Sequence, residues 1–253
     1  MIKLSSSKLI IFTSLFLIAT SNISFFTHVL NVYPFNGKNI LFILSLGILF
    51  TSVNIILLCL LCYGKVTRPM LIIVLLISSL AAYFMDSYHV IIDDKMIENI
   101  IKTDTAESLD LLSIKLLAYL ILIGILPAAL IMQITVIKKP LKIAMISRLK
   151  LIASSLIVAV VTILLFGNFY ASFFREHKSL RFHANPSYYI YSVGKYLGSF
   201  FKHGPIPFQR IGIDAHISAL DEDRELVVLV VGETARADHF SLNGYSKKTN
   251  PLL

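Results

Sequence analysis

The stretch "VVGETARADHF", residues 230–240, holds residue types that could bind a metal ion or attack an ester. It closes a short apolar, β-branched run, which is typical of a strand buried in an α/β sheet, and ligands of such sheets gather beyond the carboxyl ends of the strands. Glu233 would stand at such an end, where its carboxylate can bind a cation, with Asp238 and His239 as further candidate ligands. A lone glutamate after a strand is more often a solvated residue or a neighbour of a helix N-cap, so the pattern alone indicates metal binding only weakly.

Two other kinds of reactive side chain give little chemistry by themselves. Thr234 lies beside this carboxylate and is a candidate nucleophile, but the sequence shows neither a base nor an orienting partner for it. Cys59 and Cys62 form a CxxC motif inside a long apolar segment, away from aqueous redox partners. We interpret these cysteines as packing residues rather than as a redox or metal site.

A second polar patch lies in "DDKMIENIIKTDTAESLDLLS". Residues 86–110 hold seven acidic side chains against two lysines, a net charge of −5. Within them Asn99, Thr103 and Glu107 are spaced i, i+4, i+8, so they share one face if the stretch is a single helix. On the residues alone, a solvated amphipathic helix accounts for this pattern.

The elements that must position these residues are mostly membrane-spanning helices. The chain is 56% hydrophobic and 15% charged, and no acidic residue falls in residues 1–85 or 111–175. A hydrocarbon core of ~30 Å needs about 20 apolar helical residues to cross it. Five segments satisfy or approach that length, and we expect all five to be spans: 9–30, 40–63, 69–85, 111–137 and 151–170.

Polar residues and prolines inside these segments predict local features of the spans. Thr20, Ser21, Asn22 and Ser24 cluster within the first span, and we expect them to face a neighbouring helix rather than a transported solute. Pro69 suits the first turn of the third span, where its missing N–H needs no partner. Pro127 is expected to kink the fourth span.

The distribution of Lys and Arg predicts the orientation of the spans. With a cytoplasmic N-terminus, the inner segments hold nine of these residues and the short outer loops hold three. This positive-inside bias places the chain after residue 170 on the outer face. The net charge of +8 is therefore mostly a signal of topology, and we expect no nucleic-acid partner.

The region after the fifth span changes character. Residues 187–201 combine six aromatic side chains with a single charge, Lys195, which predicts a helix at the outer membrane surface. A helix buried against the fourth and fifth spans remains the alternative. The prolines and glycines of "KHGPIPFQRIG" indicate a linker, so residues 171–220 are an interfacial helix and linker, and residues 221–253 begin another domain.

Five spans, an interfacial segment and "VVGETARADHFSLNGYSKKTNPLL" together resemble the bacterial phosphoethanolamine transferases that modify lipid A. The resemblance implies an α-helical membrane domain of five transmembrane helices (residues 1–170) in the inner membrane. It also implies that residues 221–253 are the truncated start of an α/β alkaline-phosphatase-like periplasmic domain, which uses zinc as its cofactor. The N-terminus is expected in the cytoplasm and the C-terminus in the periplasm.

The resemblance also implies roles for single residues. Glu233 corresponds to a zinc ligand of the family, whereas Thr234 is not the family's nucleophile. The nucleophilic Thr and the other zinc ligands are expected beyond Leu253, so we expect this chain alone to be inactive. Asn99, Thr103 and Glu107 correspond to residues that contact the ethanolamine headgroup.

The reaction implied is the transfer of phosphoethanolamine from phosphatidylethanolamine to lipid A, which weakens the attraction of the outer surface for cationic peptides such as polymyxin. A phosphoglycerol transferase or a sulfatase of the same superfamily is a related alternative. A non-catalytic membrane module or a truncated gene product is the alternative from another class.

Overall fold

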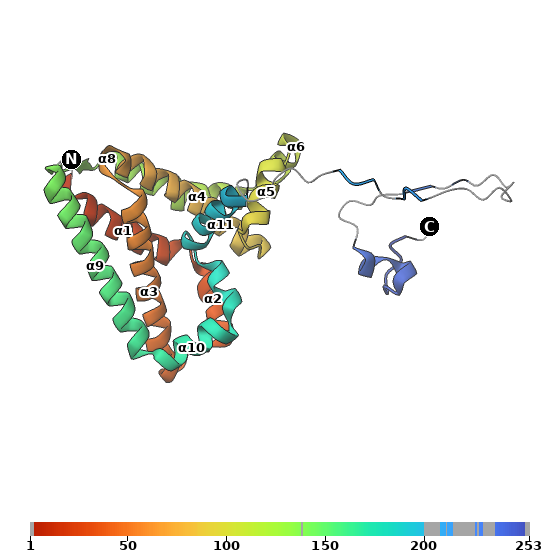
Figure 1. Ribbon diagram of the computed structural model, residues 1–253, viewed down its shortest axis with the longest axis horizontal. Helices are drawn as coiled ribbons and strands as arrows, with labels where there is room; N and C mark the ends of the chain where they lie inside the picture. The colour runs from red at the N-terminus through yellow and green to blue at the C-terminus, as the bar shows by residue number, and fades with distance from the viewer. Residues whose placement is uncertain are drawn as a thin grey trace. The chain divides into compact units, whose positions relative to one another are not determined.

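The computed structural model describes residues 3–137, 139–199, 208–210, 212–214, 226, 228–229 and 236–250, apart from the side chain of Lys38 (Figure 1). The chain divides into two compact units, Met1–Gly204 and Pro205–Leu253. Each unit is described by itself.

Long apolar helices make up most of the first unit. Four stretches among the described residues are long and apolar enough to cross a membrane, and a bent pair of helices makes a fifth if it counts as one span. The predicted helical membrane domain is thus confirmed with four spans, or with five. The pair is α1 (Ser6–Thr20) and α2 (Ile23–Val32), and the four stretches are α3 (Gly37–Leu61), η1 with α4 (Gly64–Val66 and Thr67–Tyr88), α7 with η2 and α8 (Ile114–Tyr119, Leu120–Ile125 and Leu126–Gln133) and α9 (Leu141–Leu165).

The boundaries differ most from the prediction in the last span. Helix α9 begins at Leu141, ten residues before the expected start, and ends at Leu165 rather than at residue 170. Phe166 breaks the helix there, and a separate helix, α10 (Gly167–Glu176), continues the chain. The basic residues of 141–150 therefore form the first turns of the span instead of a loop.

The first span is bent by 57° between α1 and α2. The side chain of Asn22 explains the break, because its Nδ2 donates to the carbonyl oxygen of Leu17 at 2.9 Å, in the last turn of α1. An asparagine amide that bonds to the backbone in this way competes with the helical hydrogen-bond ladder. The predicted polar cluster of this span thus ends a helix.

The fourth span contains a π-helical segment, η2, directly before the turn that holds Pro127. Proline has no N–H to donate to the carbonyl four residues earlier, and a wider turn is one way for the backbone to accommodate it. Within η2, Gly124 packs closely on α4, because a Cβ at this position would lie 2.7 Å from Ser79 Oγ. The irregularity expected at Pro127 therefore takes the form of a π-helical segment.

A short pair of strands ties the start of the first span to the end of the fourth. Strand β1 (Lys3–Leu4) pairs in parallel with β2 (Thr135–Val136). The N-terminal end of α1 and the C-terminal end of α8 therefore lie at the same face of the membrane domain, as four consecutive crossings require.

The segment that connects α4 to α7 forms short helices at one end of the bundle. Figure 1 shows α5 (Asp94–Lys102) and α6 (Thr105–Asp110) there, with α11 (Ser187–Ser199) beside them. α11 follows α10 and η3 (Lys178–His183), and it covers residues 187–199 of the helix predicted over 187–201. The last two residues of that prediction lie outside the described residues. It packs mainly against α5, and it also contacts α3 and, through Tyr189, α4. Its place at the outer membrane surface stays a prediction.

The second unit contains little regular structure among its described residues. Two short 3-10 turns, η4 (Ala237–His239) and η5 (Ser241–Asn243), follow each other along the chain. Gly244 then takes a left-handed backbone conformation, with φ at 91°, which suits a residue without a Cβ.

Candidate functional site

The acidic segment 86–110 folds as two separately capped helices. Asp93 caps α5, with its Oδ1 accepting a hydrogen bond from the backbone N–H of Met96 at 2.8 Å. Asp104 caps α6 in the same way, accepting from the N–H of Glu107 at 2.8 Å. A carboxylate at an N-cap satisfies one of the unpaired donors of the first turn and favours the positive end of the helix dipole. The sequence signal for the second cap is Asp104 with Glu107 three residues later, a capping-box spacing.

This break corrects the arrangement predicted for Asn99, Thr103 and Glu107. Asn99 lies on α5 and Glu107 lies on α6, while Thr103 ends α5 with an extended backbone, ψ 131°. The single helical face that would carry all three residues is therefore wrong, because Asp104 starts a new helix. Thr103 stays linked to Asn99, since its hydroxyl donates to the Asn99 carbonyl oxygen at 2.7 Å.

The functional groups of these three residues differ in how free they are. The side chains of Asn99 and Glu107 are exposed and make no hydrogen bond or ion pair with the part of the chain that the structure describes. Thr103 is half-buried, and its hydroxyl proton is already donated to Asn99. Its oxygen keeps lone pairs, so Thr103 can accept a hydrogen bond but cannot donate one without rotating away. Together they offer a carboxylate, an amide and an acceptor oxygen.

Helix α11 holds α5 in place. Apolar side chains of α5, Met96 and Ile97, pack into a small core with Met85 and Tyr189. At the rim of this contact, Lys195 Nζ lies 2.8 Å from Asp94 Oδ1. Helix α5 is therefore fixed to the end of the membrane bundle, and α6, whose residues are all exposed, follows it directly along the chain.

The contact between Lys195 and Asp94 shifts both side chains towards their charged forms. The ammonium of Lys195 lowers the pKa of Asp94, and the carboxylate raises the pKa of Lys195. Sequence reasoning noted Lys195 as the one charge of its segment but assigned it no partner. The sequence signal for this pair is a single cation in an aromatic segment together with an acid-rich loop that is expected on the same side of the membrane.

A buried polar network lies at the break of the first span. Asn22 Oδ1 accepts from the backbone N–H of Asn185 at 2.9 Å, and Asn22 Nδ2 donates to the Asn185 carbonyl oxygen at 2.7 Å. Asn185 Nδ2 in turn donates to the carbonyl oxygen of Ser78 at 2.9 Å. The network joins the first span, α4 and the segment before α11, so the predicted packing role of this polar cluster is confirmed.

Asp86 extends the network towards the acidic helices. One carboxylate oxygen accepts from the N–H of Ser24 at 2.9 Å, in the first turn of α2, and the other accepts from Tyr119 Oη at 3.0 Å. Asp86 thus caps α2 from a neighbouring helix, which leaves the side chain of Asn22 free for its other bonds. Sequence reasoning counted Asp86 only as part of the loop, although an acid that ends an apolar span is usually functional or paired.

His183 closes the same network. Its Nδ1 lies 3.3 Å from Ser24 Oγ, and its ring stacks on that of His28 with centroids 4.1 Å apart. Burial, together with the nearby His28 and His89, lowers the pKa of His183 to about 4. The ring is therefore neutral at physiological pH and acts as a packing and hydrogen-bonding group.

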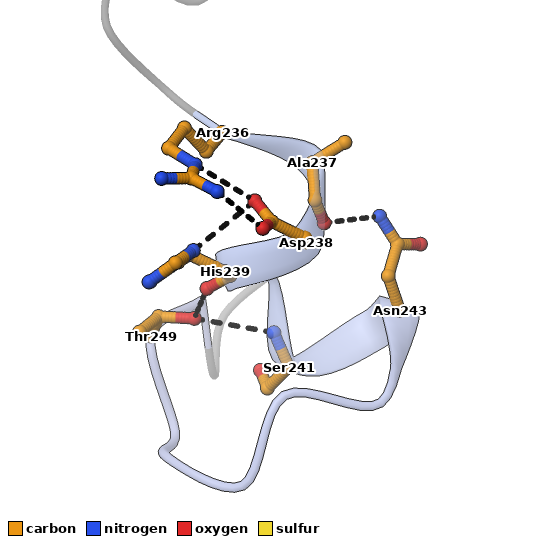
Figure 2. Close-up of polar contacts among 7 residues, drawn as sticks. All are labelled: Arg236, Ala237, Asp238, His239, Ser241, Asn243 and Thr249. Carbon is orange, nitrogen blue, oxygen red and sulfur yellow. Dashed lines mark hydrogen bonds and ion pairs between the residues drawn. The ribbon is translucent and has the colours of Figure 1, made fainter. Parts of the chain in front are cut away.

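The structure describes some of the candidate ligands of the C-terminal stretch, Asp238 and His239, but not all of them. Glu233 and Thr234 lie outside the described residues. Figure 2 shows Arg236 and His239 both directed at Asp238, with bonds from Arg236 of 3.0 and 2.6 Å and from His239 of 3.1 Å. The Arg236 guanidinium lowers the pKa of Asp238. Within the described residues, no group of three His, Cys, Asp or Glu side chains is placed to hold a metal ion.

The turn after Asp238 is closed by hydrogen bonds to the backbone. Thr249 Oγ1 donates to the carbonyl oxygen of His239 at 2.6 Å and accepts from the N–H of Ser241 at 3.1 Å (Figure 2). Asn243 Nδ2 donates to the Ala237 carbonyl oxygen at 2.8 Å. These polar residues of the GETARADHFSLNGY block and the segment after it shape the loop.

The CxxC motif forms no disulfide. Cys59 and Cys62 are free and buried, and both pack in the apolar core between α1, α3 and α4. This agrees with the packing role expected from the sequence.

Comparison with known proteins identifies the family. Residues 50–200 match the family model described as Phosphoethanolamine transferase EptA/EptB. The chain belongs to this family. The matched range begins within α3 and ends after α11, so it contains the acidic helices α5 and α6 and the segment that docks them.

Individual relatives agree with the family match. The chain is 38% identical to phosphatidylethanolamine transferase Mcr-2 of Escherichia coli, over 95% of this chain and 45% of the relative. It is 37% identical to phosphoethanolamine transferase EptA of Escherichia coli K12, over 92% of this chain and 43% of the relative. The solved structure of the integral membrane lipooligosaccharide phosphoethanolamine transferase A (EptA) from Neisseria meningitidis matches with a TM-score of 0.89 and 29% identity, over 98% of this chain and 47% of that one.

These matches confirm the resemblance drawn from the sequence motifs. They show a multi-pass helical membrane protein of an enzymatic family. The chain spans a little under half the length of the relatives that it matches.

Proposed function

We propose that this chain supplies the membrane domain and the headgroup-binding helices of a phosphoethanolamine transferase. The donor is phosphatidylethanolamine and the acceptor is lipid A. The family match supports the reaction class, and the names of the relatives support the donor and the group that is transferred.

The acidic helices provide the observation that carries this proposal. Among the described residues, Glu107 is an unpaired, exposed carboxylate on a helix that Asp104 caps and that follows the docked helix α5. The ethanolamine headgroup ends in an ammonium, which is the natural partner of such a carboxylate in a charge-assisted hydrogen bond.

The other two residues suit the rest of the headgroup. The Asn99 amide can donate to a phosphate oxygen, since its side chain has no partner among the described residues. Thr103 keeps only its acceptor capacity while its proton bonds to Asn99, so we assign it to the ammonium rather than to the phosphate. The proposed site therefore holds the ammonium between Glu107 and Thr103.

Zinc is the cofactor that the family resemblance implies, and we propose Glu233 as one of its ligands. The described residues that follow it in the sequence do not form a zinc site by themselves, because Asp238 is held by Arg236 and His239. Catalytic zinc sites use about three protein ligands plus an open position. The remaining ligands and the nucleophile would come from the part of the relatives' length that this chain does not span.

We further propose that the domain lies in the bacterial inner membrane with its N-terminus in the cytoplasm. The nine-to-three distribution of Lys and Arg supports this orientation, and it places α5 and α6 on the periplasmic side. In intact spheroplasts, a membrane-impermeant thiol reagent should label Thr105→Cys but not Lys142→Cys, in a background with both native cysteines replaced by Ala. Labelling of Lys142→Cys alone would reverse the orientation.

The headgroup role is tested by a matched pair of substitutions in a chain of the relatives' length. Glu107→Gln should reduce the modification of lipid A about ten- to a hundredfold, since one charge-assisted contact is worth about 1.5–3 kcal/mol. Glu98→Gln is the control, because Glu98 is an acid of the neighbouring helix α5 and is paired with Lys102 at 2.5 Å. Mass spectrometry of lipid A from cells that lack other transferases gives the readout.

Two outcomes would count against the proposal. Equal activity of Glu107→Gln and the unmodified enzyme would mean that Glu107 does not bind the headgroup and that these helices are only a solvated surface. Transfer by residues 1–253 alone, in the same cells, would show that the chemistry does not need residues outside this chain.

A further inference from the structure

An apolar groove of about 360 Å³ lies between α1, α4 and the fourth span. Leu4 and Ile134 line one end of the groove, and Phe16 and Leu122 line the other. Its walls are almost entirely apolar. The end lined by Leu4 and Ile134 lies at the face of the membrane domain where β1 pairs with β2.

Cations surround this end. Lys8 is one helical turn from Phe12, which lines the groove, so the two side chains share a face of α1. Arg68 Nη2 donates to the carbonyl oxygen of Ile134, which places the guanidinium beside the last residue of the wall. Lys3 is next to Leu4, and Lys139 follows closely after β2.

These cations have no acidic counterpart in the surrounding segments. No Asp or Glu occurs in residues 1–85 or 111–175, which hold both the walls of the groove and this end. Among the described residues, none of the four side chains forms an ion pair. A phosphate would therefore find unneutralised positive charge, whereas a headgroup ammonium would be repelled.

The length of the groove fits one leaflet. From Leu122 to Ile134 the helical rise is roughly 18 Å at about 1.5 Å per residue. Half of a hydrocarbon core of ~30 Å is about 15 Å, which is the depth of one acyl chain. A groove that starts among cations and ends near the bilayer centre has the dimensions of a single lipid.

We propose that this groove binds one acyl chain of an anionic phospholipid, whose phosphate lies against Lys8 and Arg68. Basic pockets between transmembrane helices are the usual sites for such lipids. The groove starts beside Arg68, in the first turn of α4, whereas α5 and α6 follow the other end of that helix, about 33 Å away for 22 residues. The lipid site is thus distinct from the headgroup site and does not depend on its role.

The absence of tryptophan from the chain makes a direct test possible. Leu130→Trp places a single fluorophore on the groove wall, at a position where the leucine is 62% exposed. Ile157→Trp is the matched control, since this residue is 63% exposed on α9 and does not line the groove. Each variant of the 253-residue chain is reconstituted in phosphatidylcholine vesicles with increasing fractions of brominated phosphatidylglycerol or brominated phosphatidylethanolamine, and quenching is measured.

Selective binding predicts that the anionic lipid quenches the Leu130→Trp variant at a severalfold lower fraction than the zwitterionic lipid does. The Ile157→Trp control should show no preference. Adding Lys8→Gln to the Leu130→Trp chain should weaken the preference about fivefold, and adding Lys150→Gln, at a basic residue away from the groove, should not. Equal quenching of the Leu130→Trp variant by both lipids would overturn the proposal, as would an equal preference for the anionic lipid in the Ile157→Trp control.

Discussion

Two polar regions of the membrane domain use the same kinds of side chain for opposite purposes. Around Asn22 and Asn185, each 2% exposed, the two amides bond to backbone groups, and the Asp86 carboxylate accepts from a backbone N–H and from the Tyr119 hydroxyl. On α5 and α6, Asn99 and Glu107 are exposed and have no side-chain partner among the described residues. The first region joins distant parts of the chain, and the second presents groups to a ligand.

The difference follows from where each group finds its hydrogen bonds. A buried polar group must be paired within the protein, because an unpaired one costs about 1–3 kcal/mol. An exposed group keeps its bonds to water and can exchange them for bonds to a ligand at little cost. The buried polar residues of the spans therefore stabilise the fold, whereas the exposed ones on α5 and α6 are free to bind a ligand.

The largest expected effect comes from breaking the buried network. Asn22→Leu removes three hydrogen bonds and leaves the backbone N–H and carbonyl of Asn185 buried without partners. We expect a loss of about 2–4 kcal/mol in stability, towards the lower end because hydrogen bonds inside membrane proteins average less than in water. Thermal unfolding of the chain in detergent micelles measures it.

A suitable control is Thr51→Val. Among the described residues, the Thr51 hydroxyl bonds only to the Gly47 carbonyl oxygen in its own helix, so its removal leaves no buried donor elsewhere. If Asn22→Leu and Thr51→Val lower the unfolding temperature by the same small amount, the network does not hold the domain together.

A smaller effect is expected from titrating His183. Its pKa of about 4 in the folded chain, against 6.5 when solvated, means that the unfolded chain binds more protons between these values. The contribution of the neutral His183 ring to the stability is therefore fully present above about pH 6.5, and it is lost as the pH drops towards 4. His183→Phe keeps a ring to stack on His28 but cannot titrate, so its unfolding temperature should fall less between about pH 7 and about pH 5. Parallel curves for both proteins would assign the pH dependence to other groups.

How well the sequence predicts each region depends on how far apart along the chain the interacting residues lie. The spans follow from local composition, and hydropathy alone gives α3, α4 and α9. The partners of Asn22 are 163 residues away in Asn185, and nothing in the pattern of either segment connects them. Sequence reasoning therefore predicted that the polar cluster packs, but not against what.

The candidate headgroup site shows the same limit in a different way. The i, i+4, i+8 spacing of Asn99, Thr103 and Glu107 favoured one continuous helix, because periodicity takes no account of breaks. The cap at Asp104 competes with helix continuation, and its bond to the N–H of Glu107 decides the local structure. Asp104 and Glu107 at capping-box spacing carried that information, which the periodic spacing alone did not use.

The smallest effect on stability should come from the residue with the largest proposed effect on transfer. Glu107→Gln leaves the cap of α6 intact, because Asp104 bonds to the backbone N–H of residue 107 and not to its side chain. The Glu107 side chain is exposed and packs in no core, so unfolding in detergent should change by no more than about 0.5 kcal/mol, as for most surface substitutions. A clear loss of stability would mean that Glu107 has a structural partner, and any loss of transfer could then no longer be assigned to headgroup binding. Unchanged stability together with reduced transfer separates recognition on α6 from architecture at Asn22.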